Sequence, residues 1–415
     1  MKSLSLIALT CLFASPLIGQ YKDPNFPKPT SGYGADGTHP VGITSFENPL
    51  FPGENIQIYY PSDLSAPVPT LFYSHAYGGS NSLSVLGLLT FVAKKGYAIV
   101  FVPYQTVGVS VAERYDNLLA GFRQAARDNP GTIDTTRVGF LGHSFGGGAS
   151  FAIAYKCFTD NNWGQAGRFL HSSAPWYSFQ ITQTELQAFP SDAKLIVEVY
   201  ENDPVNDHRM AADMFRNINI PADEKDFILV KPDTINGYEY TAEHDLPTSL
   251  VTLDAMDYYA YYRLIDALAD YAFTGNLAAK DVALGNGSAA QVTMPTGLKP
   301  LVQTDAPEVT IPESNYVFPC SSVGNPRNSF CSLNTSIAEG TLPGSRIYPN
   351  PFRSHIYLNH LRGNETFTLT NLSGQVLYQG KALAQQDFSS LPPGCYFLIV
   401  RRDSSNYRFR LIKEE

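Results

Sequence analysis

The chain has 415 residues, of which 44% are hydrophobic and 16% are charged, and its formal net charge is −9. This length predicts two or three domains, and this composition is typical of a globular chain rather than a disordered one. The lysines and arginines form no cluster, so we expect no binding to nucleic acids or to anionic membranes.

The first residues have the pattern of a secretory signal peptide, residues 1–19. Lys2 precedes a short apolar stretch, residues 4–13, and small residues follow up to Gly19. Because this stretch is too short for a membrane span, we expect export of the chain and cleavage near Gly19. No later segment of the sequence is apolar for long enough to cross a bilayer.

Residues 20–275 are expected to form one α/β domain. Alternating residues at 55–60 predict an early antiparallel strand, and a long amphipathic helix at about 250–273 closes the domain. Short apolar stretches predict buried strands at residues 70–74, 97–103, 137–141, 168–173, 194–200 and 226–231. Helical patterns separate these strands over much of the domain, which predicts a doubly wound, mostly parallel sheet.

The sequence Gly142-His143-Ser144-Phe145-Gly146 lies between an apolar strand and a helix of small residues. A turn this tight holds its central residue in strained backbone and leaves no room for bulky neighbours, which accounts for Gly142 and Gly146. This arrangement is similar to the nucleophile turn of α/β-hydrolases, where the serine lies above the positive end of a helix. We therefore expect Ser144 to be a catalytic nucleophile.

A second motif, His75-Ala76-Tyr77-Gly78-Gly79, directly follows the strand at residues 70–74. In α/β-hydrolases the loop at this place gives one backbone N–H to the oxyanion hole, and the residue after the nucleophile gives the other. The predicted donors are therefore the N–H groups of Tyr77 and Phe145. We expect His75 to support this loop rather than to act as a base.

In α/β-hydrolases the catalytic serine, acid and histidine follow one another in this order along the chain. We therefore expect the acid and the histidine on loops after later strands. Asp203 and Asp207 both follow a late strand, and we favour Asp203 because Pro204 is expected to open the next helix, with Asp207 inside it. Of the eight histidines, His244 follows both the nucleophile and the acid on a polar loop of this domain, so it is the predicted base. A surface histidine without a catalytic role is the alternative.

Residues 276–340 are expected to form an appendage and a linker. Cys320 and Cys331 bracket a polar loop there, and in an exported chain we expect them to form a disulfide. No histidine or cysteine pair nearby has the spacing of metal ligands, so no metal site is expected. Cys157 lies in the helix after Ser144 and is expected to be a buried apolar residue.

Residues 341–415 alternate short strands with turn signals, which predicts a small all-β sandwich. This tail resembles the C-terminal sorting domain of cargo of the type IX secretion system of Bacteroidota. The segments that carry the resemblance are Tyr348–Pro351, Asn371–Val376, Leu391–Tyr396 and Leu411–Lys413. The resemblance implies contact with the type IX secretion machinery, export across both membranes, removal of the tail, and release or attachment at the cell surface.

The catalytic region resembles the dienelactone-hydrolase-like branch that contains bacterial cutinases and polyester (PET) hydrolases. The matching pieces occur in the same order: Tyr77, Ile133–Arg137, Gly142–Gly148, Ala174–Trp176, Glu201–Asp203 and His244. In that family the aromatic residue of the oxyanion loop and the tryptophan line the acyl site. The resemblance therefore implies that Tyr77 and Trp176 bind substrate, and His143, next to the nucleophile, is also expected to bind it. Phe145 stands where that family usually has methionine.

The expected activity is hydrolysis of carboxylic esters by Ser144, His244 and Asp203, in a monomer and without a cofactor. The expected substrate is a short- or medium-chain ester, including esters of a cutin-like or synthetic polyester. Three other readings stay open: a lipase or phospholipid acetylhydrolase, a secreted serine peptidase, and an inactive surface-binding protein on the same fold.

Overall fold

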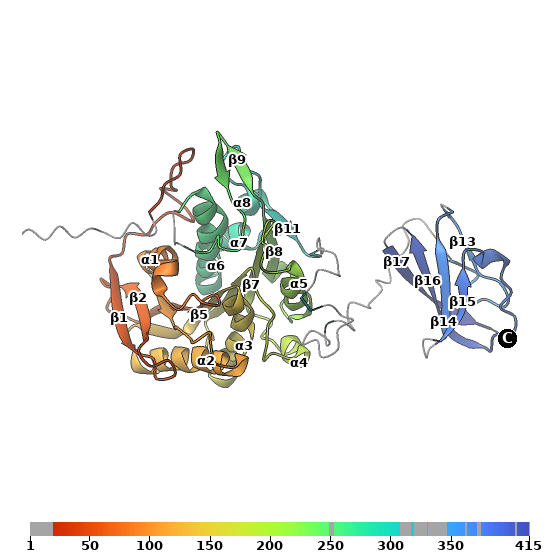
Figure 1. Cartoon of the computed structure of the whole chain (residues 1–415), viewed down its shortest axis with the longest axis horizontal. Helices are drawn as coiled ribbons and strands as arrows, with labels where there is room; N and C mark the ends of the chain where they lie inside the picture. The colour runs from red at the N-terminus through yellow and green to blue at the C-terminus, as the bar shows by residue number, and fades with distance from the viewer. Residues whose placement is uncertain are drawn as a thin grey trace, which may run out of the picture. The chain divides into compact units, whose positions relative to one another are not determined.

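The computed structural model describes residues 20–248, 253–307, 317–318, 330 and 347–414, except residues 362, 372–374 and 403–404. The expected signal peptide and the expected disulfide between Cys320 and Cys331 lie outside the described residues. The chain divides into two compact units, residues 1–319 and 320–415, and each is described by itself (Figure 1). In the described part, no helix combines the length and the apolar character that a membrane span requires.

A mixed sheet runs through the first unit, and its nine described strands follow the order β1-β2-β4-β3-β5-β6-β7-β8-β11. The strands from β4 to β8 in this order are parallel to one another, whereas β1, β2 and β11 pair in antiparallel fashion at the edges. The strands are β1 Val41–Glu47, β2 Asn55–Pro61, β3 Val68–Ser74, β4 Ala98–Phe101, β5 Ile133–His143, β6 Gly167–Ser173, β7 Lys194–Tyr200, β8 Lys225–Val230 and β11 Val302–Thr304. A separate hairpin, β9 Asp233–Ile235 and β10 Tyr238–Tyr240, projects from the unit (Figure 1).

Helices cover both faces of this sheet. The helices of the first unit are α1 Leu86–Lys94, α2 Val111–Asp128, α3 Phe145–Asp160, α4 Gln183–Gln187, α5 His208–Asn217, α6 Arg263–Thr274, α7 Leu277–Ala283 and α8 Ala289–Val292. In β3, Leu71 and Tyr73 share a core with α1 and α6, whereas Phe72 stacks on Phe140 of β5 and contacts Phe122 of α2. The predicted α/β class is therefore confirmed, and burial on both faces explains why the central strands are apolar throughout.

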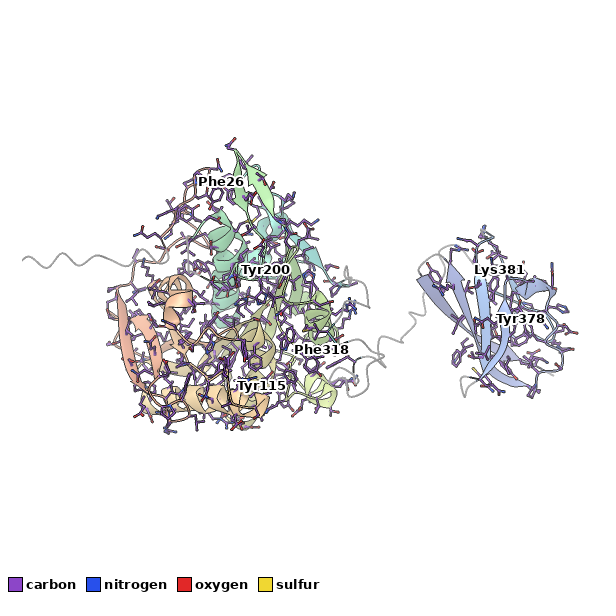
Figure 2. All side chains as sticks on the ribbon, in the orientation of Figure 1. Phe26, Tyr115, Tyr200, Phe318, Tyr378 and Lys381 are labelled. Atoms are coloured by element: carbon purple, nitrogen blue, oxygen red, sulfur yellow. The ribbon has the colours of Figure 1, made fainter. Side chains whose placement is uncertain are left out.

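The helix expected at about 250–273 differs from the prediction. Among the described residues it begins at Met256, and its first part, Met256–Tyr262, is π-helical before α6 starts. Tyr258, Tyr261 and Tyr262 are all buried in this part, so buried side chains do not keep to the single stripe of a regular amphipathic helix. Tyr200, at the end of β7, lies in the same core (Figure 2).

The prediction that Pro204 opens a helix containing Asp207 is wrong. Helix α5 begins at His208, and Asp207 is its N-cap. The Asp207 carboxylate accepts the N–H of Arg209 at 2.9 Å and forms an ion pair with the Arg209 guanidinium at 3.0 Å. Asp207 supplies the side-chain acceptor that the first N–H groups of a helix need, whereas Pro204 lies in the loop before α5.

Residues 277–304 extend the first unit beyond the expected domain end. Helix α7 packs on α6, and β11 adds an antiparallel strand beside β8. The buried carboxylate of Asp226 on β8 accepts hydrogen bonds from Gln291 at 2.6 Å and from Gln303 at 2.8 Å. These bonds attach α8 and β11 to the edge of the sheet.

The second unit is antiparallel and all-β in its described residues. Its strands are β12 Ile347–Tyr348, β13 Tyr357–Leu358, β14 Thr366–Asn371, β15 Val376–Gly380, β16 Gly394–Arg402 and β17 Ser405–Lys413. Strands β12 and β13 pair with each other, and the other four form a sheet in the order β15-β14-β16-β17. Alternate residues such as Phe367, Leu369, Leu398 and Val400 form its core, as the period-two pattern of the sequence predicts.

Candidate active site

Ser144 lies at the tight turn between β5 and α3. Its backbone has φ 56° and ψ −121°, a region that side chains rarely adopt. The N–H of Ser144 donates to the carbonyl of Ser173 at 3.0 Å, and its carbonyl accepts the N–H of Trp176 at 2.8 Å. A side chain on Gly142 would come within 2.3 Å of the Gly146 carbonyl oxygen, so only glycine fits there. The strained turn thus occurs where the motif predicts it.

Asp203 and His244 form a hydrogen-bonded pair. Nδ1 of His244 lies 2.8 Å from Oδ2 of Asp203, while Oδ1 accepts the N–H groups of Val205 and Asn206 at 2.8 and 2.9 Å. Burial alone would raise the pKa of Asp203, but the hydrogen bonds from His244, Asn206 and Val205 lower it below its usual value. An ionised Asp203 keeps the proton on Nδ1, which leaves the lone pair of Nε2 free to accept a proton.

The hydroxyl of Ser144 contacts Asn206. Oγ lies 3.4 Å from Nδ2 of Asn206, and among the described residues it makes no hydrogen bond to His244. Ser144 and His244 are 7% and 8% exposed, so both lie in the wall of the site. Catalytic hydrogen bonds are often long or poorly aligned without ligand, and they tighten when the substrate binds.

His143 packs against the histidine of this pair. Its Nε2 donates to the backbone carbonyl of His244 at 2.8 Å, and the two ring centroids are 4.8 Å apart. Burial, with repulsion from His244, lowers the pKa of His143 to about 3. His143 is therefore neutral, and it holds the loop that carries His244.

The loop after β3 is held by His75. Nδ1 of His75 donates to the carbonyl of Ala76 at 2.6 Å, and its Nε2 accepts the N–H of Tyr104 at 3.1 Å. The ring stacks on Tyr104, and burial lowers the pKa of His75 to about 4. Both ring nitrogens are thus used within the fold, which suits a residue that supports the loop.

Arg114 of α2 connects the two residues expected to donate to the oxyanion. Its guanidinium lies 5.2 Å from the ring centre of Tyr77 and 5.5 Å from that of Phe145. Arg114 and the Tyr77 hydroxyl both donate to the carbonyl of Thr106, at 2.7 and 2.8 Å. Phe145 is the first residue of α3, so its N–H has no acceptor within the helix.

Trp176 contacts the nucleophile through the backbone. Its N–H donates to the Ser144 carbonyl, so the Ala174–Trp176 turn and the nucleophile turn are joined directly. The half-buried indole packs edge-on against Phe318, with ring centroids 5.6 Å apart, and Phe318 also contacts Tyr177.

Two neighbouring pockets adjoin these residues and share Asp245 and Thr248. The first, of about 310 Å³, lies along the oxyanion loop and is bordered by Tyr73, Tyr77 and His143. Its walls are mainly apolar because the glycines of the loop and Val85 contribute to them.

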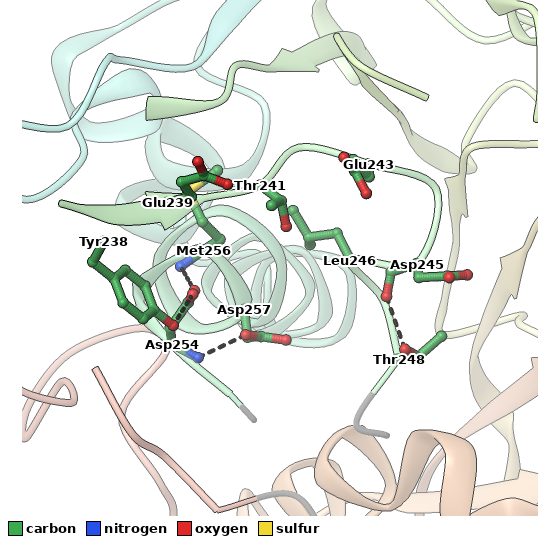
Figure 3. A pocket seen from close by; sticks show the side chains of 10 residues that line it. All are labelled: Tyr238, Glu239, Thr241, Glu243, Asp245, Leu246, Thr248, Asp254, Met256 and Asp257. Atoms are coloured by element: carbon green, nitrogen blue, oxygen red, sulfur yellow. Dashed lines mark hydrogen bonds between the residues drawn. The ribbon is translucent and has the colours of Figure 1, made fainter. Parts of the chain in front are cut away.

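The second pocket, of about 230 Å³, is acidic. The carboxylates that line it are those of Glu239, Glu243, Asp245, Asp254 and Asp257 (Figure 3). Burial raises the pKa of Asp254 and of Asp257, whereas the side chains of Glu239, Glu243 and Asp245 are exposed. Among the described residues, no group of three or more histidine, cysteine, aspartate or glutamate side chains could hold a metal ion.

The structure thus brings Ser144, Asp203, His244, His143 and Trp176 to one end of the sheet. Two further residues contact this candidate site, Asn206 and Arg114, and sequence reasoning missed both. Asn206 follows the acid by three residues, and Arg114 lies in the first turns of an amphipathic helix. Neither position has a local pattern that separates it from an ordinary polar surface residue.

Comparison with known proteins identifies one part of the chain. A comparison of the whole chain with curated proteins finds no match. Residues 346–414 match the family model of the secretion system C-terminal sorting domain. The match agrees with the antiparallel all-β second unit and with the motifs of the tail. The second unit is therefore a sorting domain of the type IX secretion system, and the protein is exported to the cell surface or the extracellular space.

Proposed function

We propose that the first unit is a serine carboxylic-ester hydrolase with an acyl-enzyme intermediate, similar in activity to cutinases and polyester hydrolases. The observation that carries this proposal is the 2.8 Å bond between His244 and Asp203 beside a serine held at φ 56°. An oriented histidine with a free Nε2, next to a strained serine at a helix start, is the arrangement that nucleophilic acyl transfer needs.

In the proposed reaction, Nε2 of His244 takes the proton of Ser144 as Oγ attacks the ester carbonyl. The negative charge on the carbonyl oxygen is stabilised by the N–H groups of Tyr77 and Phe145, which Arg114 holds together through their rings. The proton then passes to the departing alcohol. Water attacks the acyl group in the same way, and His244 returns a proton to Oγ when the acid leaves.

The surface around the site supports a neutral, apolar substrate. Tyr77, Val107 and Val205 are 55%, 73% and 54% exposed, and each lies on a loop that contacts the site. The acidic pocket beside His244 disfavours a substrate that carries negative charge there. These features suit an ester between apolar groups better than a charged ester or peptide.

One observation favours an inactive binding protein. Ser144 is only 7% exposed, and its hydroxyl contacts Asn206 rather than His244. Such a protein would keep the fold of the site without its chemistry.

The test is hydrolysis of p-nitrophenyl esters, from acetate to palmitate, by the mature chain and by Ser144→Ala. We expect the mature chain to hydrolyse these esters and Ser144→Ala not to. The acyl length that is hydrolysed fastest then separates a short-ester hydrolase from a cutinase-like or a lipase-like enzyme. Diethyl p-nitrophenyl phosphate should label Ser144, as detected by mass spectrometry. A folded protein that takes up the label and cleaves casein but hydrolyses none of these esters is a serine peptidase. A folded protein that neither hydrolyses the esters nor takes up the label has no active Ser144, and the binding-protein alternative then holds.

A further inference from the structure

Asn206 joins the three parts of the candidate site. Its backbone N–H donates to Oδ1 of Asp203 at 2.9 Å, and its side-chain Nδ2 lies 2.6 Å from the carbonyl of Ala174 and 3.4 Å from Oγ of Ser144. The residue is 3% exposed. The buried Asn206 therefore contacts the acid, the Ala174–Trp176 turn and the nucleophile, so its role is not limited to packing.

The orientation of this amide follows from its partners. The carbonyl of Ala174 can only accept, so the nitrogen and not the oxygen of the side chain must face it. One hydrogen of Nδ2 is used in that short bond, and the second is left to point at Oγ. Ala174 itself has φ 41°, an unusual value for a residue with a side chain, and the bond from Asn206 helps to hold it there.

A donor aimed at Oγ affects the two halves of the reaction differently. During acylation the neutral hydroxyl already accepts this bond before Oγ attacks, so the bond changes little between the ground state and the transition state. During deacylation water adds to the acyl carbon and gives a proton to His244. Oγ is a weakly accepting ester oxygen in the acyl-enzyme, and it gains negative charge as the C–Oγ bond breaks and His244 donates the proton to it. Hydrogen bonds to a charged oxygen are shorter and stronger than those to a neutral one, so the 3.4 Å contact is expected to tighten at this step.

We propose that Asn206 is a further catalytic residue, whose second amide hydrogen stabilises Oγ of Ser144 as the leaving atom when the acyl-enzyme is hydrolysed. This proposal rests on the ester hydrolase function proposed above. An amide suits the role because it donates without changing its charge over the whole pH range in which His244 must cycle.

The experiment measures acylation and deacylation separately by stopped flow, with p-nitrophenyl butyrate and the mature chain. Asn206→Ala removes the donor, and Asn206→Asp removes it at nearly constant volume. For whichever of them folds, we expect deacylation to slow by about 10- to 100-fold, with acylation changed by less than about threefold. The variant should therefore release one equivalent of p-nitrophenolate in a burst, and kcat and KM should fall together.

Asn117→Ala is the matched control, because Asn117 is 4% exposed and its amide bonds, within the part of the chain that the structure describes, to Asn48 and Leu50. It should lower the melting temperature without changing the ratio of the two rates. Equal slowing of both steps in the Asn206 variants, or no slowing of deacylation, overturns the proposal. Failure of the ester hydrolase function itself looks different, because then neither the parent chain nor any variant releases p-nitrophenolate or labels Ser144.

Discussion

Asp203 and Asp207 are four residues apart, yet the structure gives them different partners. Asp203 binds His244, whereas Asp207 caps α5 and pairs with Arg209. The sequence favoured Asp203 through an expected helix start at Pro204, and this reason was wrong although the structure pairs the favoured residue with His244. Helix capping by Asp207 is the physical reason that separates the two carboxylates.

This difference predicts opposite effects of two similar substitutions. Asp203→Asn should lower kcat by about 10⁴-fold, because the amide no longer holds the proton on Nδ1 of His244. Asp207→Asn should leave kcat nearly unchanged. Asparagine still caps the helix, but the buried Arg209 loses the carboxylate of Asp207 as a partner, so the free energy of unfolding should fall by about 3 kcal/mol. Ester hydrolysis and urea unfolding of both variants check this, and a large loss of kcat in Asp207→Asn would reverse the assignment of the acid.

Two buried histidines predict that the protein loses stability in mild acid. Burial lowers the pKa of His75 to about 4 and of His143 to about 3, against an ordinary value of 6.5. Below pH 6.5 the unfolded chain binds protons that the folded chain excludes until the pH reaches these lower values. Each histidine then lowers the free energy of unfolding by about 1.4 kcal/mol per pH unit, or by about 2 kcal/mol at pH 5. The neighbours of His143 in the fold are His244 and Asp203, and those of His75 are Tyr104 and Phe101.

Urea unfolding at pH 7 and pH 5 measures this loss. His143→Gln does not titrate, and its amide can still donate to the carbonyl of His244. We therefore expect the variant to lose about 2 kcal/mol less than the parent chain between the two pH values. An identical pH dependence of both proteins would mean that His143 is protonated without unfolding.

The turn between β5 and α3 requires glycine at more than one position. A Cβ on Gly146 would lie 2.0 Å from the carbonyl oxygen of Ser74, which belongs to β3. No side-chain rotation can relieve a clash with backbone, so α3 would have to move away from the sheet. The close approach of helix and strand therefore sets the position of Ser144 as well as the packing of the core.

Gly146→Ala is expected to destabilise the protein by about 3 kcal/mol or more and to abolish ester hydrolysis. Gly78→Ala is the comparison, because Gly78 has φ +85° but nothing within 4 Å of a Cβ. Gly78→Ala should lower the free energy of unfolding by only about 1 kcal/mol, because backbone strain is the one penalty expected there. Urea unfolding of both variants gives the difference, and equal costs would show that the turn adapts to a side chain.

The predictable elements are those encoded by local pattern. The strands β3 to β8, the capped start of α2 at Ser110 and the turn at Ser144 follow from apolar stretches, a capping box and glycine spacing. The π-helical segment Met256–Tyr262, the added strand β11 and the contact of Asn206 with Ser144 do not. These depend on residues 60 or more positions apart, or on how several tyrosines share one core, which no local pattern records.

At the scale of the whole molecule, the two units have separate cores. The first contains residues from Tyr59 to Leu301, and the second contains residues from Phe352 to Leu411. The sorting domain match, residues 346–414, falls entirely within the second unit. The chemistry proposed for Ser144 and the export signal are therefore carried by different parts of the chain.

Removal of the second unit is expected to abolish export and to leave the first unit intact. A chain of residues 20–318 keeps Phe318 against Trp176, whereas a chain of residues 20–307 loses this contact. We expect the longer chain to match the full chain in kcat, KM and the melting temperature of its first unit, because each unit buries its own apolar residues. The shorter chain should keep the same fold but show a changed KM, since the indole of Trp176 is then exposed. Calorimetry and ester kinetics on the three chains check this, and a first-unit melting temperature that falls in residues 20–318 would show that the sorting domain stabilises the first unit.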